Sequence, residues 1–230
     1  MTKFYPALFA MSVLLLACST ATENCDSVTQ DRIYQSYTAS YDQKGDATSA
    51  TAQLRFGDGT GTTLALTGKC NLTHDSYTLS KINLFGTLYT GQGGLLKPTH
   101  TFTFTDSEGN ELRNSLSIPT IAFDAPPSSL SKSATTKIAF SGGALAKTES
   151  VSLTITSPES EGYRSASVTV STEGAQALNV SPSDLTSLTK GIKVMILKRS
   201  LTTNTSQSKS VGGMVTGSYT TNETAITIVD

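Results

Sequence analysis

Short segments in which apolar and polar residues alternate recur along most of the chain. Because successive side chains of a β-strand point to opposite faces of a sheet, this period of two predicts half-buried strands. The run Thr-Phe-Thr-Phe-Thr at 101–105 is the purest example, with both phenylalanines on one face. Short strands separated by turn residues, without a long helix, are typical of β-sandwiches and β-barrels. The other predicted strands cover residues 37–41, 50–56, 82–89, 116–123, 151–155, 168–170, 178–180 and 192–197, and a hairpin of 214–219 with 225–229 that turns at Thr221-Asn222.

The composition agrees with an exported all-β protein. Charged residues make up 15% of the chain, against about 25% in an average soluble protein. Threonine is abundant, and its β-branched side chain suits the solvated face of a strand. The net charge of −1 argues against nucleic acid as a partner.

Residues 124–129, Asp-Ala-Pro-Pro-Ser-Ser, mark the clearest internal boundary. Two consecutive prolines favour an extended polyproline conformation, and small polar residues follow them, as in an interdomain linker. The sequence therefore predicts two domains, at residues 18–125 and 126–230, behind a leader at residues 1–17. In the second domain, Ser181 as N-cap and Pro182 at the first helical position predict one short helix.

The first 17 residues have the pattern of a secretory signal peptide, with one cation at Lys3 and an uncharged run from Phe4 to Ala17. The run is too short for a membrane-spanning helix, which needs about 20 residues. It ends in Leu15-Leu16-Ala17-Cys18, which resembles the lipobox of bacterial lipoproteins. An ordinary signal peptide with an unrelated cysteine near its end is the alternative.

The lipobox resemblance implies a lipid anchor at Cys18. In that family a diacylglycerol is attached to the cysteine thiol, the signal peptide is cleaved just before the cysteine, and the new amino group is acylated, commonly with palmitate. By the same resemblance, Ser19 in the next position implies transfer to the outer membrane. The expected location is therefore the bacterial cell envelope, with the protein held at the outer membrane through its N-terminal lipid.

Once Cys18 is assigned to lipid, two cysteines remain, Cys25 and Cys70. In an oxidising envelope compartment an even pair predicts a disulfide, and two free thiols are the alternative. A loop of this length, about 45 residues, corresponds to roughly 4 kcal/mol of stabilisation in the chain-entropy model. The bond would also tie the anchor to the first domain, because the seven residues from Cys18 to Cys25 span at most about 25 Å.

The lipobox, the proline-rich linker and the two strand-rich blocks together are similar to bacterial envelope lipoproteins with tandem immunoglobulin-like or fibronectin-like domains. This resemblance implies an all-β fold of two tandem Ig-like antiparallel β-sandwiches, with one short helix in the second. The chain departs from true immunoglobulin domains because it has no tryptophan and so lacks their Cys…Trp…Cys spacing.

The sequence predicts no catalytic residue, no metal ligand and no cofactor. His74 lies in a turn-like segment and His100 precedes a strand, so both histidines are predicted to be loop residues. No Gly-x-Ser-x-Gly elbow accompanies them, and no H-E-x-x-H or C-x-x-C spacing points to zinc.

Three polar or glycine-rich segments have simple structural interpretations. Residues 106–111, Asp-Ser-Glu-Gly-Asn-Glu, are predicted to be a hairpin tip, with a calcium site as the open alternative because oxygen ligands gather around a glycine. Residues 91–94, Gly-Gln-Gly-Gly, are predicted to be a flexible connection, since no Lys-Ser/Thr pair of a phosphate loop follows. A basic cluster is predicted to be a solvated strand edge; it comprises Lys190, Lys193, Lys198 and Arg199.

These features favour a non-enzymatic, lipid-anchored envelope protein that acts as a β-sandwich binding module or as a structural or adhesion module. The expected partners are the membrane, through the lipid, and an envelope protein or glycan. Two alternatives stay open. One is an envelope hydrolase that uses scattered acids or the histidine pair, and the other is an accessory lipoprotein of a secretion or pilus assembly.

Overall fold

The structure, a computed structural model, describes residues 22–83, 86–158 and 162–230. Within these ranges the regular elements are β-strands and a few short 3-10 turns, which confirms the all-β prediction. No helix in the same ranges is long and apolar enough to cross a membrane. The signal segment and Cys18 lie outside the described residues, so the lipid anchor stays a prediction.

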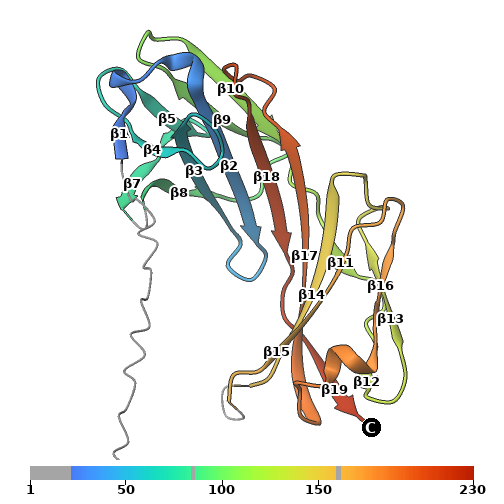
Figure 1. The fold of residues 1–230 in the computed structure, drawn as a ribbon. Helices are drawn as coiled ribbons and strands as arrows, with labels where there is room; N and C mark the ends of the chain where they lie inside the picture. Colours follow the sequence, from blue (N-terminus) through green and yellow to red (C-terminus); the bar gives the residue numbers. More distant parts are fainter. Residues whose placement is uncertain (1–21, 84–85, 159–161) are drawn as a thin grey trace, which may run out of the picture.

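Three sheets make up the fold (Figure 1). The 12-stranded sheet contains β1 (Thr22–Asn24), β2 (Ile33–Asp42), β3 (Ala47–Phe56), β4 (Thr62–Ala65), β7 (Ser80–Asn83), β8 (Thr87–Gly94), β12 (Ser129–Ser131), β14 (Glu149–Thr156), β15 (Ser165–Val170), β17 (Gly191–Asn204), β18 (Gly213–Thr220) and β19 (Thr224–Val229). The 4-stranded sheet contains β5 (Asn71–His74), β6 (Tyr77–Thr78), β9 (His100–Thr105) and β10 (Glu111–Leu116). The 3-stranded sheet contains β11 (Ala122–Phe123), β13 (Thr136–Ser141) and β16 (Ala177–Val180).

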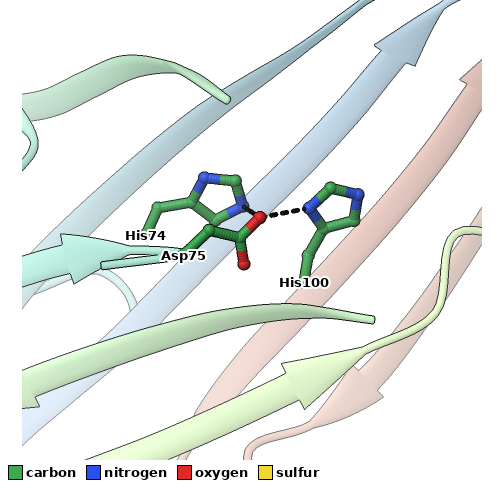
Figure 2. Close-up of side chains that lie close together, drawn as sticks. All are labelled: His74, Asp75 and His100. Atoms are coloured by element: carbon green, nitrogen blue, oxygen red, sulfur yellow. Dashed lines mark hydrogen bonds and ion pairs between the residues drawn. The ribbon is translucent and has the colours of Figure 1, made fainter. Parts of the chain in front are cut away.

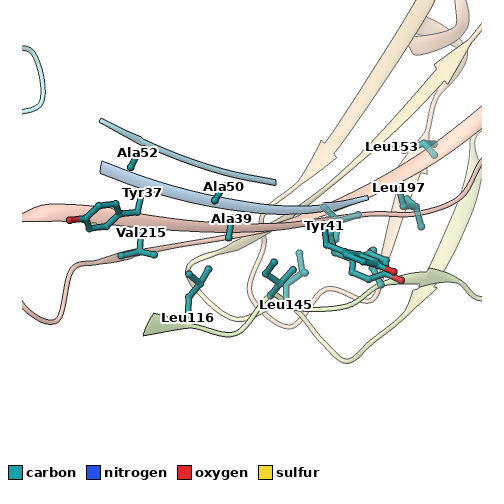
Figure 3. Packing of buried hydrophobic residues seen from close by; sticks show 14 of the residues in the cluster. Tyr37, Ala39, Tyr41, Ala50, Ala52, Leu116, Leu145, Leu153, Leu197 and Val215 are labelled. Carbon is teal, nitrogen blue, oxygen red and sulfur yellow. The ribbon is translucent and has the colours of Figure 1, made fainter. Parts of the chain in front are cut away.

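The alternating sequence pattern determines which face of each strand is buried. In β2 every second residue from Ile33 to Tyr41 is buried, and the residues between them are partly exposed. In β9 the buried positions are His100, Phe102 and Phe104. The ring of Tyr37 from β2 stacks on Phe102 with 4.8 Å between centroids, so the 4-stranded sheet packs on the large sheet through these faces. Figure 3 shows further members of the same core along β2, β3 and β18.

Strand β17 is 14 residues long and links the β14–β15 part of the large sheet to the part that contains β18 and β2 (Figure 1). One of its edges pairs with β14, and the other pairs first with β19 and then with β18. The predicted hairpin of 214–219 with 225–229 is therefore wrong, because β18 and β19 follow one another along the same edge of β17. The chain does not reverse at Thr221 because this residue bonds to Leu197 in both directions, through its backbone N–H and its side-chain oxygen.

Strand β18 also pairs in parallel with β2 over its whole length. Strands from both sides of residue 126 therefore share one sheet, and the predicted split into two domains is not confirmed. Parallel pairing also joins β1 to β4 and β12 to β19, so the large sheet is mixed rather than purely antiparallel.

The predicted short helix is not confirmed, because only a 3-10 turn, η4 (Pro182–Leu185), forms. Ser181 and Asp184 form a capping box at its start, in which the Ser181 backbone N–H donates to the Asp184 carboxylate at 2.8 Å. The Thr186 hydroxyl then donates back to the Ser183 carbonyl, a local bond that competes with helix propagation.

The glycine-rich segment 91–94 is part of β8, paired with β3 across a bulge at Thr48 and Ser49, so its prediction as a flexible connection is wrong. Gly91 allows a close approach here, because a Cβ at this position would lie 2.8 Å from the Leu79 side chain. The predicted strand at 82–89 is two strands, β7 and β8, that pair as a hairpin.

Candidate functional site

The predicted disulfide between Cys25 and Cys70 is present, with an S–S distance of 2.07 Å. Cys25 begins a short 3-10 turn, η1 (Cys25–Ser27), directly after β1, and Cys70 directly precedes β5. Both side chains belong to the hydrophobic core. The bond therefore ties the first described strand, β1, to the connection between β4 of the large sheet and β5 of the 4-stranded sheet.

The segment 106–111 forms the predicted hairpin tip between β9 and β10. Asp106 is fully buried, and one carboxylate oxygen accepts the backbone N–H groups of Glu108 and Asn110 at 2.9 and 2.8 Å. The other oxygen accepts the Asn110 amide and lies 2.8 Å from the ammonium of Lys209. The cation paired with this carboxylate is thus Lys209, in the loop before β18. The same carboxylate stabilises the turn at 106–111 by accepting its backbone N–H groups.

Acid is expected to destabilise the protein through Asp106. Burial alone would raise the pKa of this carboxyl group, but hydrogen bonds from Lys209 and Asn110 outweigh burial and lower the pKa to about 2. A carboxylate with a depressed folded-state pKa stabilises the fold above its unfolded-state pKa, so about 2 kcal/mol is lost as the pH falls from about 4 to 2. Lys209→Met should remove most of this contribution, as measured by urea unfolding between pH 2 and 7.

The control for this prediction is Lys44→Met, which removes an ion pair with Glu223 whose side chains are both largely exposed. Because solvent screens this exposed pair, the change should leave the acid dependence of the free energy of unfolding as it is in the wild-type protein. A Lys209→Met protein with the wild-type acid profile would contradict the assignment.

The basic cluster is not a solvated edge, because β17 is a central strand. Lys193 and Arg199 are buried, whereas Lys190 and Lys198 are exposed. The Arg199 guanidinium pairs with the buried Glu149 carboxylate at 2.6 Å. It also donates to four backbone carbonyls, those of Thr120, Gly142, Gly143 and Ala144.

The glycine at 142 is required by this arrangement. Its φ is +106°, and a Cβ there would lie 2.3 Å from the Thr120 carbonyl oxygen. The Arg199 guanidinium therefore links three segments by hydrogen bonds: the segment before β11, the turn after β13 and the start of β14.

The two histidines are not loop residues, and this prediction is wrong. His74 is the last residue of β5 and His100 is the first of β9. Their side chains are buried, at 1% and 0% exposed, and the rings stack with 5.3 Å between centroids. Asp75 lies between them (Figure 2), in a turn where it and Ser76 both have positive φ, at 48° and 74°. Asp tolerates this left-handed conformation better than most residues, and here it directs a carboxylate at two imidazoles.

Asp75 and His100 are held by several hydrogen bonds. The His100 Nδ1 atom lies 2.9 Å from Asp75 Oδ2, and the Lys97 backbone N–H donates to His100 Nε2 at 3.4 Å. Because Nε2 accepts, His100 carries its hydrogen on Nδ1 and donates it to Asp75. The other Asp75 oxygen accepts the Thr101 N–H at 2.8 Å, and the Lys97 ammonium lies 3.2 Å from Oδ2. Burial acts to raise the pKa of Asp75, but these donors outweigh it and lower the pKa, so the carboxylate is ionised.

His74 is less well satisfied. Its Nε2 atom is buried, has no hydrogen-bond partner in the part of the chain that the structure describes, and lies 3.8 Å from Asp75 Oδ2. Burial lowers the pKa of His74 more than the nearby Asp75 raises it, so the imidazole is neutral at neutral pH. The ring also packs on Phe102, with 4.7 Å between centroids. We name His74, Asp75 and His100 the histidine cluster.

An open polar cavity of about 610 Å³ reaches the histidine cluster at Asp75 and is also lined by Lys97. Its remaining lining is hydroxyl-bearing or charged: Thr73, Ser76, Thr99, Thr101, Thr103, Glu111 and Arg113. The partners of the two imidazoles are Asp75 and the Lys97 backbone, and no serine or cysteine of the described ranges is among them. The histidine cluster thus offers a ligand the negative charge of Asp75 and the imidazole nitrogens. Within the described ranges, no serine or cysteine nucleophile is hydrogen-bonded to either imidazole, as acyl transfer would require.

Comparisons with known proteins add little to this geometry. No protein-family model and no curated protein matches the sequence. Among solved structures, the chain is similar to fibronectin(III)-like modules of Clostridium thermocellum CbhA, at 8% identity and a TM-score of 0.25, over 84% of this chain and 92% of that chain. It is also similar to a structure concerning host cell surface retention of a 1.5-MDa bacterial ice-binding adhesin, at 14% identity and a TM-score of 0.24, over 86% of this chain and 65% of that chain. Such low TM-scores carry no argument, so the Ig-like or fibronectin-like topology stays a prediction.

Proposed function

We propose that the chain is a non-enzymatic lipoprotein of a bacterial envelope, anchored through Cys18 at the outer membrane. Its β-sandwich architecture would bind an envelope protein or glycan, or serve as a structural or adhesion module. The alternatives of an envelope hydrolase and of an accessory secretion or pilus lipoprotein stay predictions.

The disulfide next to the lipobox is the observation that carries the proposal. A buried disulfide is typical of exported proteins in oxidising compartments, which agrees with a secretory signal. Strand β1 begins at Thr22, so the chain from Cys18 to the first strand reaches at most about 14 Å. β1 pairs with β4, and Cys25 is bonded to Cys70 directly after it. A lipid at Cys18 would therefore hold the large sheet close to the membrane.

The engagement of the buried charged groups supports a non-enzymatic role. Asp106 is bonded to Lys209 and Glu149 to Arg199, and both carboxylates are buried. Catalytic acids and bases need access to a substrate proton, whereas these groups are held by structural partners.

The test is Cys18→Ser, which is expected to abolish fatty-acid labelling and to move the protein from the membrane fraction to the soluble fraction. The reason is that stable anchoring needs two or more acyl chains, each contributing about 0.8 kcal/mol per buried methylene. The Cys25→Ala/Cys70→Ala variant is the matched control, because it removes both other cysteines and should keep the label. Label that persists on Cys18→Ser would refute the anchor.

A further inference from the structure

The histidine cluster has the composition of a metal site. Imidazole nitrogen suits divalent transition metals such as Zn²⁺, Ni²⁺ and Cu²⁺, and a carboxylate is a common further ligand. We propose that His74, Asp75 and His100 bind one divalent transition-metal ion, for which Zn²⁺ is the probe, through two imidazole nitrogens and one carboxylate oxygen. Three protein ligands leave a fourth tetrahedral position for water or another ligand. Of the three residues, Asp75 also lines the polar cavity. The proposal is independent of the lipid anchor.

The distances are close to those that the ion needs. The three ligand atoms all lie within 4.8 Å of one another. Asp75 Oδ2 is 2.9 Å from His100 Nδ1 and 3.8 Å from His74 Nε2. A tetrahedral ion with bonds of about 2.0–2.1 Å separates its ligand atoms by about 3.4 Å. Shifts well within the reach of side-chain rotation would therefore bring all three atoms onto one ion.

The His74 nitrogen without a hydrogen bond indicates a ligand at this position. Buried side-chain nitrogens almost always have a hydrogen-bond partner, and one without a partner needs an explanation. His74 Nε2 is buried among the core residues, is not hydrogen-bonded within the described ranges, and faces the Asp75 carboxylate (Figure 2). The Nε2 atom of an imidazole is a common metal ligand, and no hydrogen-bond partner within the described ranges occupies it here.

Lys97 provides the cation that a metal ion would replace. Its ammonium lies 3.2 Å from Asp75 Oδ2, and its side chain is 44% exposed, so it can swing into the cavity without unpacking the core. An ion at the cluster would repel this ammonium. Lys97 therefore acts as the competitor that sets the affinity of the site.

Binding also changes the hydrogen position on His100. To ligate through Nδ1, the His100 ring must carry its hydrogen on Nε2 instead of Nδ1. The Lys97 N–H then loses its acceptor, because Nε2 becomes a donor. Metal binding is thus coupled to a displacement of the Lys97 backbone as well as its side chain.

The experiment is titration of the full-length protein, purified in detergent, with Zn²⁺ by calorimetry and with Co²⁺ by visible absorption. We expect one equivalent per chain and the intense d–d bands of tetrahedral Co²⁺. Lys97→Ala should raise the affinity by at least about tenfold because it removes the competing charge. His74→Ala and Asp75→Asn should lower it by more than the roughly 10–100-fold cost of losing a second-shell partner.

The matched control is Lys81→Ala, which removes an exposed lysine of β7 and should leave the affinity unchanged. If His74→Ala does not fold, Lys97→Ala still decides the question, because it keeps the cluster intact. The proposal is overturned if neither the wild-type protein nor Lys97→Ala binds Zn²⁺ or Co²⁺ at millimolar concentration. It is equally overturned if binding is unchanged by Lys97→Ala or survives in folded His74→Ala.

Discussion

Replacing Arg199 with methionine is expected to lower the free energy of unfolding by about 3–5 kcal/mol, the usual cost of breaking a buried ion pair. The Arg199 and Glu149 side chains are only 5% and 9% exposed. The change therefore leaves the Glu149 carboxylate buried without its partner. It also removes the donor from four backbone carbonyls around the turn at Gly142. Urea unfolding of the two proteins at pH 7 measures the difference.

Arg113→Met is the matched control for Arg199. Its ion pair with Glu111 has the same 2.6 Å distance, but the side chains are 65% and 49% exposed. Solvent screening should limit the effect of this change to about 1 kcal/mol or less. The double variant Arg199→Met/Glu149→Met should recover only part of the loss, because the carbonyls remain without a donor. Equal effects of Arg199→Met and Arg113→Met would contradict the central role of Arg199.

Removing the disulfide is expected to cost about 4 kcal/mol, from the chain-entropy treatment of a bond between residues 45 positions apart. Alanine is the better replacement for both cysteines because the sites are buried and a serine hydroxyl there would lack a partner. Amide hydrogen exchange should show the largest loss of protection in β1, since this strand has three residues and the disulfide follows it directly. Urea unfolding of Cys25→Ala/Cys70→Ala measures the total.

A reductant provides the control for this second variant. Dithiothreitol should lower the stability of the wild-type protein towards that of Cys25→Ala/Cys70→Ala and should leave the variant itself unchanged. Wild-type protein in which Cys25 and Cys70 react as free thiols, or a variant within about 1 kcal/mol of wild type, would be evidence against a stabilising bond.

The strands could be predicted from the sequence because they depend on the alternation of neighbouring residues. The disulfide could be predicted because the chain has only three cysteines. The alternation in β2, β9 and β14 is a property of neighbouring residues, and it survives into the burial pattern. The pairing of Cys25 with Cys70 followed from the assignment of the third cysteine to lipid. Ser181 was recognised as a cap, but the helix behind it stopped after one turn because the following hydroxyl residues bond locally.

The histidine cluster and the Arg199 network could not be predicted because they depend on which strands become neighbours. His74 and His100 meet only because β5 pairs with β9, and spacing along the chain carries no sign of that. Lysine and arginine are usually surface residues, so the sequence gives no sign that Lys193 and Arg199 are buried. They are buried because β17 lies between β14 on one side and β18 and β19 on the other. Nor does a turn-like sequence at 221–222 reveal that Thr221 stays bonded to Leu197.

The parallel pairing of β2 with β18 constrains the order in which the protein can fold. Partners such as Ser40 and Ser218 are 178 residues apart, so β2 gains its second neighbour only after nearly the whole chain has left the ribosome. Until then β2 is an open edge of ten residues that contains neither lysine nor proline, the two residues that most often block aggregation at an edge. Long-range closure of this kind is slow. Throughout this interval the unpaired N–H and C=O groups of β2 are open to pairing with a strand of another chain, so aggregation competes with folding until β18 arrives.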